Sequence, residues 1–231
     1  MVGTLVACAV SLPAGLDAAQ APAPIADNSF LIEEAYNQET GVVQHINALL
    51  RSRRTWSYSF TQEWPLSGQR HQLSYTVPIE GGLGDVALNY RHQIGGLGRN
   101  VAVAPRLSVI LPTGNADRGY GTGAVGYQFN LPVSVLIVPQ LVTHWNAGAT
   151  VTPAIDETVY NAGASAIWLV QPVFNVMLEL AWTGTAGSDE LIVNPGVRWA
   201  HNLGSLQIVP GIGFPIDHGV FLYLSFEHPF K

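Results

Sequence analysis

The chain has 231 residues, of which 48% are hydrophobic and only 11% are charged, and its formal net charge is −6. Soluble domains of this apolar content usually carry about 25% charged residues, so the composition argues against a fully solvated surface. Scarce charge with high apolar content also excludes a disordered chain. The acidic balance disfavours a phosphate-binding surface for nucleic acid. The single cysteine, Cys8, excludes an intramolecular disulfide framework.

Residues 1–21 are predicted to be a signal peptide. An apolar stretch from Val2 to Val10 precedes the small-x-small site Ala19-Gln20-Ala21, so we expect cleavage after Ala21. The residues around Cys8 also resemble a lipoprotein box. A buried first strand or helix is the third alternative for this stretch.

Residues 22–40 differ in composition from the rest of the chain. Pro22 and Pro24 mark a linker, and Ser29 is a candidate cap for one or two helical turns. Three alternatives stay open for this N-terminal segment. It folds against the periplasmic mouth of a barrel formed by residues 41–231, enters that barrel as a small plug, or is a frayed terminus.

Residues 41–231 show the period-two alternation that is typical of strands. In the clearest segments one face carries apolar side chains and no charge, for example Val125, Tyr127, Phe129 and Leu131. No apolar run after the N-terminus reaches the roughly 18 residues that a transmembrane helix needs. A closed β-barrel is the other way to satisfy every backbone group within a bilayer.

The sequence therefore predicts an all-β fold, a transmembrane antiparallel up-and-down β-barrel with about twelve strands. Ten and fourteen strands stay open because two regions are ambiguous, 131–142 and 151–170. Pro105, Pro195 and Pro210 lie inside expected strands, so we expect them at rims or bulges. The expected strands are 42–51, 55–64, 70–78, 84–92, 100–111, 123–132, 139–150, 158–169, 173–183, 190–200, 205–214 and 219–229.

The polar phase of these strands predicts the lining of the lumen, because the apolar face of an outer-membrane barrel meets lipid. Four Arg and four acidic residues fall on this phase. They predict either a lumen closed by ion pairs or a narrow mixed-charge constriction that selects solutes. The predicted lining residues are His45, Asn47, Arg51, Glu63, Asp85, Asn89, Arg91, Arg106, Gln128, Asn130, His144, Asn146, Asn175, Glu179, Asn194, Arg198 and Glu227.

No catalytic, cofactor or metal site is predicted. Gly121–Gly126 matches GxGxxG, but a loop precedes it and a strand follows it, which is the wrong context for a dinucleotide. The only lysine is Lys231, so a P-loop is excluded, and the histidines form no metal-binding spacing. His144 and Asn146 share the polar phase of one strand, but no serine is placed to complete a phospholipase-like set.

Six segments of the chain resemble one family. The resemblance runs from about residue 27 to the C-terminus and is most specific in the first and last of these segments, which are 27–39, 41–45, 60–65, 70–75, 84–91 and 105–114. The family is that of proteobacterial outer-membrane transporters of the meta-pathway phenol-degradation type. The resemblance implies an outer-membrane barrel that passes small, often hydrophobic, organic molecules, and it implies no catalytic residue.

We therefore expect a bacterial outer-membrane barrel, not an enzyme, that acts as a narrow channel or passive transporter for small organic molecules, hydrophobic or aromatic ones included. The alternatives are a closed structural barrel, an outer-membrane enzyme acting on lipid and, least favoured, a soluble lipocalin-like binder. Expected partners are outer-membrane lipid, a small-molecule solute and the barrel-assembly machinery, through the C-terminal strand that ends near Phe230. Neither a cofactor nor nucleic acid is expected, and the oligomeric state stays open.

Overall fold

The computed structural model describes residues 28–52, 54–66, 68–95 and 100–230. The predicted signal peptide lies outside the described residues. Within them, no helix is long and apolar enough to cross a membrane. The only helices in this part of the chain are two short 3-10 turns, η1 (Ala116–Arg118) and η2 (Pro153–Ile155).

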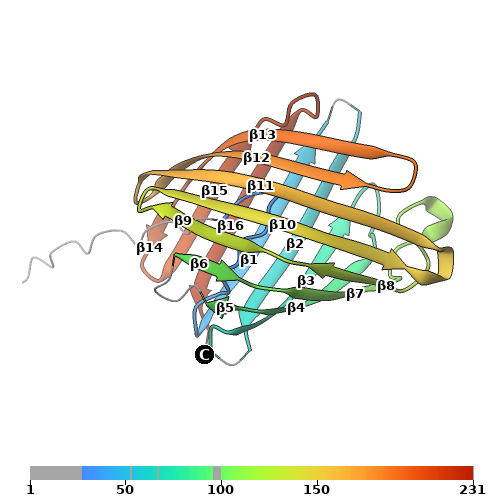
Figure 1. Cartoon of the computed structure of the whole chain (residues 1–231), viewed down its shortest axis with the longest axis horizontal. Helices are drawn as coiled ribbons and strands as arrows, with labels where there is room; N and C mark the ends of the chain where they lie inside the picture. Colours follow the sequence, from blue (N-terminus) through green and yellow to red (C-terminus); the bar gives the residue numbers. More distant parts are fainter. Residues whose placement is uncertain (1–27, 53, 67, 96–99, 231) are drawn as a thin grey trace, which may run out of the picture.

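The strands form one antiparallel sheet that closes on itself as a twelve-stranded barrel, as the sequence predicted (Figure 1). β1 and β16 close it in an unbroken register from the pair Val42 and Pro229 to the pair Arg51 and Val220. Nine of the twelve wall strands are single, uninterrupted strands. The first seven of them are β1 (Val42–Arg51), β2 (Trp56–Pro65), β3 (His71–Ile79), β4 (Val86–His92), β10 (Leu141–Thr152), β11 (Glu157–Gln171) and β12 (Phe174–Gly184). Two more, β15 (Leu206–Gly213) and β16 (Val220–Pro229), complete the continuous set.

Three wall strands are interrupted. Each consists of two collinear pieces: β6 (Val101–Val103) with β7 (Arg106–Leu111), β8 (Gly126–Asn130) with β9 (Val133–Val138), and β13 (Asp189–Trp199) with β14 (His201–Leu203). The two-residue strand β5 (Ile94–Gly95) pairs with β6 alone. The regions that the sequence left ambiguous contain β9 and β11, and the count is twelve.

The prolines lie within the wall and not at its rims, each beside an interruption in the strand or in the ladder on one side of it. Pro105 separates β6 from β7. β13 and β15 pair only over Gly196–Arg198 and Gly211–Gly213, and Pro195 and Pro210 each directly precede this short ladder. A proline has no amide hydrogen to donate, so these positions cost no ladder hydrogen bond.

The outer surface is apolar and the inside is polar, the reverse of a soluble protein. Leu107, Tyr127 and Trp145 project outward and are 54–60% exposed. Glu179, Asn194, His144 and Arg198 project inward and are at most 1% exposed. Alternation along each strand produces both faces from one sequence.

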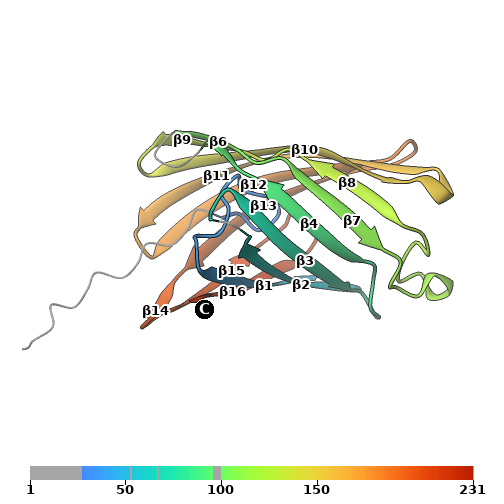
Figure 2. The ribbon, with the colours of Figure 1, turned by 90° about the horizontal axis from the view of Figure 1, so that it is seen from below.

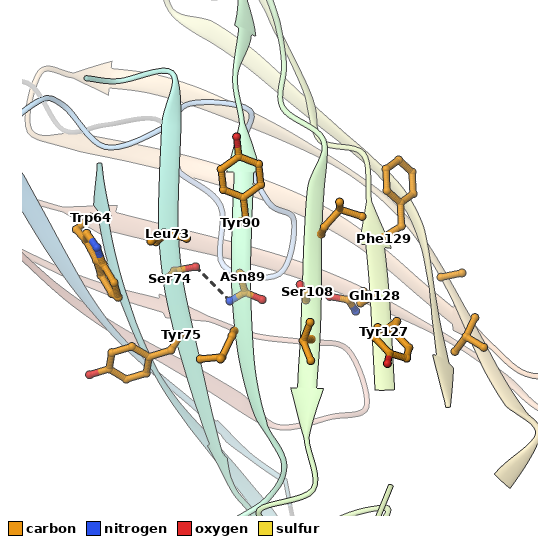
Figure 3. Close-up of a pocket in the computed structure, with 15 residues that line it drawn as sticks. Trp64, Leu73, Ser74, Tyr75, Asn89, Tyr90, Ser108, Tyr127, Gln128 and Phe129 are labelled. Atoms are coloured by element: carbon orange, nitrogen blue, oxygen red, sulfur yellow. Dashed lines mark hydrogen bonds between the residues drawn. The ribbon is translucent and has the colours of Figure 1, made fainter. Parts of the chain in front are cut away.

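One part of the outer surface is hollowed. A depression of about 740 Å³ lies over β3, β4, β7 and β8, with Trp64, Tyr75, Tyr90, Tyr127 and Phe129 among its lining residues (Figure 3). On the same strands Ser74 accepts a hydrogen bond from Asn89 at 3.1 Å. The depression belongs to the apolar face, so membrane lipid covers it.

Candidate functional site: the lumen and the segment inside it

Residues 28–38, which we call the luminal segment, run through the interior of the barrel (Figures 1 and 2). They contact the wall on all sides, from Ser165 on β11 through Asn146 on β10 to Gln72 on β3. They form no helix or strand of their own. Seven of their backbone N–H groups, those of residues 30–33, 35, 37 and 38, instead donate to wall side chains, because buried backbone groups require a partner.

Glu179 on β12 holds the first turn of the luminal segment. Its Oε1 atom accepts three backbone N–H groups, those of Phe30 at 2.8 Å, Leu31 at 2.7 Å and Ile32 at 3.3 Å. Its Oε2 atom accepts a hydrogen bond from Asn194 at 2.7 Å. A buried carboxylate that accepts four N–H groups is compensated for the loss of water.

Glu33 is the centre of the charge network in the lumen. Its carboxylate lies 3.1 Å from Nη1 of Arg91 and 2.8 Å from Nε of Arg106, and it accepts a hydrogen bond from Asn130 at 2.8 Å. Arg91 and Arg106 are directly opposed on β4 and β7. Two like charges at such positions repel each other, and the Glu33 carboxylate bridges them.

The rest of the luminal segment is held by amide and hydroxyl side chains and by Arg91, which donates to the carbonyls of Glu34 and Tyr36 and to Oδ1 of Asn37. Asn146 makes a two-point contact with Glu33, accepting its N–H and donating to its carbonyl, at 2.8 and 2.7 Å. Three further wall oxygens accept backbone N–H groups: Ser134 from Ala35, Gln93 from Asn37 and Gln72 from Gln38, at 2.7–2.8 Å. A row of wall acceptors thus takes the place that a neighbouring strand has in a sheet.

The ring of Phe30 lies in an aromatic slot. It stacks on Phe221 with ring centroids 5.3 Å apart and lies 5.2 Å from the ring of Tyr223. The other sides of the slot are Gly196 and Gly211, where an added Cβ would lie 2.6–2.7 Å from ring atoms of Phe30. Missing side chains at these two wall positions therefore create the space for the ring.

A cavity of about 210 Å³ remains between the luminal segment and the wall. Phe30 and Tyr223 line one part of it, and Glu33, Arg91 and Arg106 line another. The lumen thus combines an apolar surface and two guanidinium groups within one small space.

The structure places most of the predicted lining residues on the inward face. Arg91, Arg106, Asn130, Asn146 and Glu179 meet at the luminal segment, and Glu63 lies 3.9 Å from Arg91. By strand alternation and pairing, the inward set is Glu63, Asn89, Arg91, Arg106, Gln128, Asn130, His144, Asn146, Asn175, Glu179, Asn194, Arg198 and Glu227.

On β1 the prediction is wrong by one residue. His45 and Asn47 lie on the outer face, where His45 Nε2 is 3.3 Å from His228 Nε2 and Asn47 accepts a hydrogen bond from Tyr58 at 2.7 Å. Arg51 has the same phase and ends the strand at the rim. The inward residues of β1 are Gln44, Ile46, Ala48 and Leu50. Three of them are aliphatic because they pack on the cluster around Phe30, which inverts the usual polarity of the strand.

Asp85 lies at the rim and not in the constriction. Its carboxylate accepts N–H groups of Gly114 at 2.9 Å and Thr122 at 2.7 Å, so it joins two loops. Its partial burial acts to raise the pKa, but the hydrogen bonds from Thr122 and Gly114 outweigh that effect and hold the pKa below its ordinary value.

Sequence reasoning missed several residues of the site. Gln72, Gln93 and Ser134 bind the backbone of the luminal segment, and Glu33 supplies its central charge. Gln72 and Ser134 lie in the inward phase of their strands, so a complete list of that phase would have included them. Glu33 lies before the first strand, where period two gives no signal.

A closed barrel, apolar outside and polar inside, defines a porin-like outer-membrane β-barrel, and the protein belongs in the bacterial outer membrane. Short turns face the periplasm in such barrels. The two-residue turns 139–140, 172–173 and 204–205 lie at the end where β16 finishes, so that end is periplasmic.

Comparison with known proteins shows the fold. No known family model and no curated protein sequence matches the chain. Among solved structures, the KdgM porin has a TM-score of 0.59 at 8% identity, over 82% of this chain and 99% of that one. The COG4313 outer membrane channel from Pseudomonas putida F1 has a TM-score of 0.58 at 13% identity, over 85% and 98% of the two chains. The NanC porin has a TM-score of 0.56 at 8% identity, over 82% and 99%.

Proposed function

We propose that the protein is a channel for small organic molecules across the outer membrane, closed in this structure by the luminal segment and open when that segment moves. One observation carries the proposal. The interior is occupied by residues that precede the first strand, and these residues are fixed by side-chain hydrogen bonds, by the ion pairs of Glu33 with Arg91 and Arg106, and by one aromatic slot. Such contacts can break while every wall ladder stays intact.

The similar structures support this class of function. Each of the three is a porin or an outer membrane channel. A further similar structure is that of the KdgM porin in complex with disordered oligogalacturonate. By analogy we propose that this barrel also admits small solutes, and the family resemblance of the sequence extends the proposal to hydrophobic and aromatic ones.

A disulfide lock tests the gate. The Oγ atoms of Ser29 and Ser165 lie 2.6 Å apart across the segment and the wall, close to the roughly 2.05 Å of a disulfide. We expect the double variant Ser29→Cys/Ser165→Cys to conduct in planar bilayers when reduced and to lose its current when oxidised. The two single variants are the matched controls.

Two results would contradict the proposal. An oxidised double variant that conducts as well as the reduced one would show that the luminal segment is not the gate. No current and no solute flux in any variant would favour the closed structural barrel. Release of labelled fatty acid from outer-membrane phospholipid would instead favour the enzyme alternative.

Assembly through the C-terminal strand stays a proposal as well. β16, the last strand along the chain, pairs with β1 and carries Leu222, Leu224 and Phe226 on its outer face. We propose that the barrel-assembly machinery recognises this strand, and Phe226→Asp should slow outer-membrane insertion in cells.

A further inference from the structure

Glu33 occupies a carboxylate-binding site on the wall of the lumen. Its two oxygens are shared among three adjacent strands: Arg91 on β4, Arg106 on β7 and Asn130 on β8. Arg106 is the direct cross-strand partner of both others. The three donors therefore form one row at a single level of the barrel, and one carboxylate spans it.

The wall itself fixes Arg106. Its guanidinium donates to Asn89, Ser108 and Gln128, at 2.8–2.9 Å, and all three are wall residues. The Nε group is the one directed at Glu33. The guanidinium is thus oriented by contacts that do not depend on the luminal segment, which is the condition for a preorganised anion site.

Around Arg91 and Arg106, the positive charge of the wall is not balanced without Glu33. In the part of the chain that the structure describes, Glu33 is the only carboxylate in ion-pair contact with Arg106. Arg91 also has a wall carboxylate, Glu63, at 3.9 Å. When the luminal segment leaves, two opposed guanidinium groups face the lumen with one nearby wall carboxylate, that of Glu63 beside Arg91, which leaves about one positive charge for a mobile anion to neutralise.

The neighbouring surface is apolar. The cavity that Arg91 and Arg106 line also touches Phe30 and Tyr223, and Phe30 departs together with Glu33. Its departure uncovers the slot formed by Gly196, Gly211 and Phe221. A cationic site and an apolar slot then share one space.

We propose that the solute of this channel is a small monocarboxylate with an apolar or aromatic body, which takes the places of the Glu33 carboxylate and the Phe30 ring. This inference rests on the proposed channel function and names its substrate class. The luminal segment then competes with the solute for one site, so that solute binding and opening favour each other.

Binding of benzoate and of its neutral analogue benzamide tests the site. Calorimetry on the full chain in detergent should give about tenfold tighter benzoate binding to Glu33→Gln than to the wild type, because the competing carboxylate is gone. In that background Arg106→Gln should weaken benzoate binding by about tenfold and leave benzamide unchanged. Arg118→Gln, which removes an exposed rim arginine, is the matched control.

Heat-modifiable migration on gels checks that each variant is folded. If Arg106→Gln does not fold, Arg106→Lys replaces it, since it keeps the charge, loses the planar fork and should weaken benzoate binding to a smaller degree. Equal binding of benzoate and benzamide, or benzoate binding that is insensitive to residue 106, would overturn the inference. Together with the disulfide lock, these measurements distinguish the two proposals. Solute flux without a preference for benzoate would contradict the proposed substrate class but not the channel. Benzoate binding without solute flux would contradict the channel but not the binding site.

Discussion

The ring of Phe30 lies in the space that a side chain at Gly211 would occupy, since a Cβ atom there would be 2.6 Å from Cζ of the ring. The closest atoms are at the far end of the Phe30 side chain, so the ring can move, whereas the nearest wall atom, the carbonyl oxygen of Val197 at 3.2 Å, needs to shift only slightly. Gly211→Ala should therefore fold as a barrel with Phe30 displaced, and Gly211→Val should displace it further. We expect higher single-channel conductance in both, measured in planar bilayers.

Gly187→Ala is the matched control for this prediction, because no atom lies within 4 Å of an added Cβ at that loop position. Conductance of Gly211→Val at the wild-type level would mean that the slot does not hold the luminal segment closed.

Glu179→Ala should release the start of the luminal segment. Three backbone N–H groups would lose their acceptor, at a cost of about 1–3 kcal/mol for each donor left buried. Digestion with the Glu-specific protease Glu-C, followed by mass spectrometry, should show cleavage after Glu33 and Glu34 at least about tenfold faster than in the wild type. Asp117→Ala removes one exposed carboxylate as a control, and unchanged cleavage in Glu179→Ala would contradict the assigned role.

The rim contact of Asp85 should weaken in acid. Its pKa is below the ordinary value, so the contact contributes stability above pH about 4 and loses it as pH falls through the lowered value. Hydrogen exchange at the amides of Gly114 and Thr122 should accelerate beyond the intrinsic trend as pH falls below about 4. Asp85→Asn should show fast exchange already at pH 7. Exchange of Asp85→Asn equal to the wild type at that pH would be the contrary result.

Leu107→Arg should destabilise the barrel in lipid. Leu107 is 60% exposed on the outer face, and an arginine near the bilayer midplane costs about 2–4 kcal/mol. Thr76→Arg, on the inward phase of β3, should cost less because the lumen can hydrate the charge. Guanidinium-induced unfolding in lipid vesicles measures the loss of unfolding free energy in both variants. Equal losses would mean that Leu107 does not face lipid.

The sequence by itself determined the class of fold. Side chains that alternate between a charge-free set and a polar set indicate a sheet with one apolar and one polar face. Such a sheet closes into a barrel in a bilayer, because an unpaired strand edge would leave backbone groups without hydrogen bonds. The strand ranges and the inward direction of Arg91, Arg106 and Glu179 follow from that local pattern.

Only the tertiary structure decided what fills the lumen. The inward face of β1 is aliphatic at Ile46, Ala48 and Leu50 because it packs around Phe30, a residue from outside the sheet. Period two contains no information about such a partner, so His45 and Asn47 were assigned to the wrong face. For the same reason the central carboxylate, Glu33, was not foreseen. Its role depends on meeting Arg91, Arg106 and Asn130 in space, which depends on barrel closure and not on local sequence.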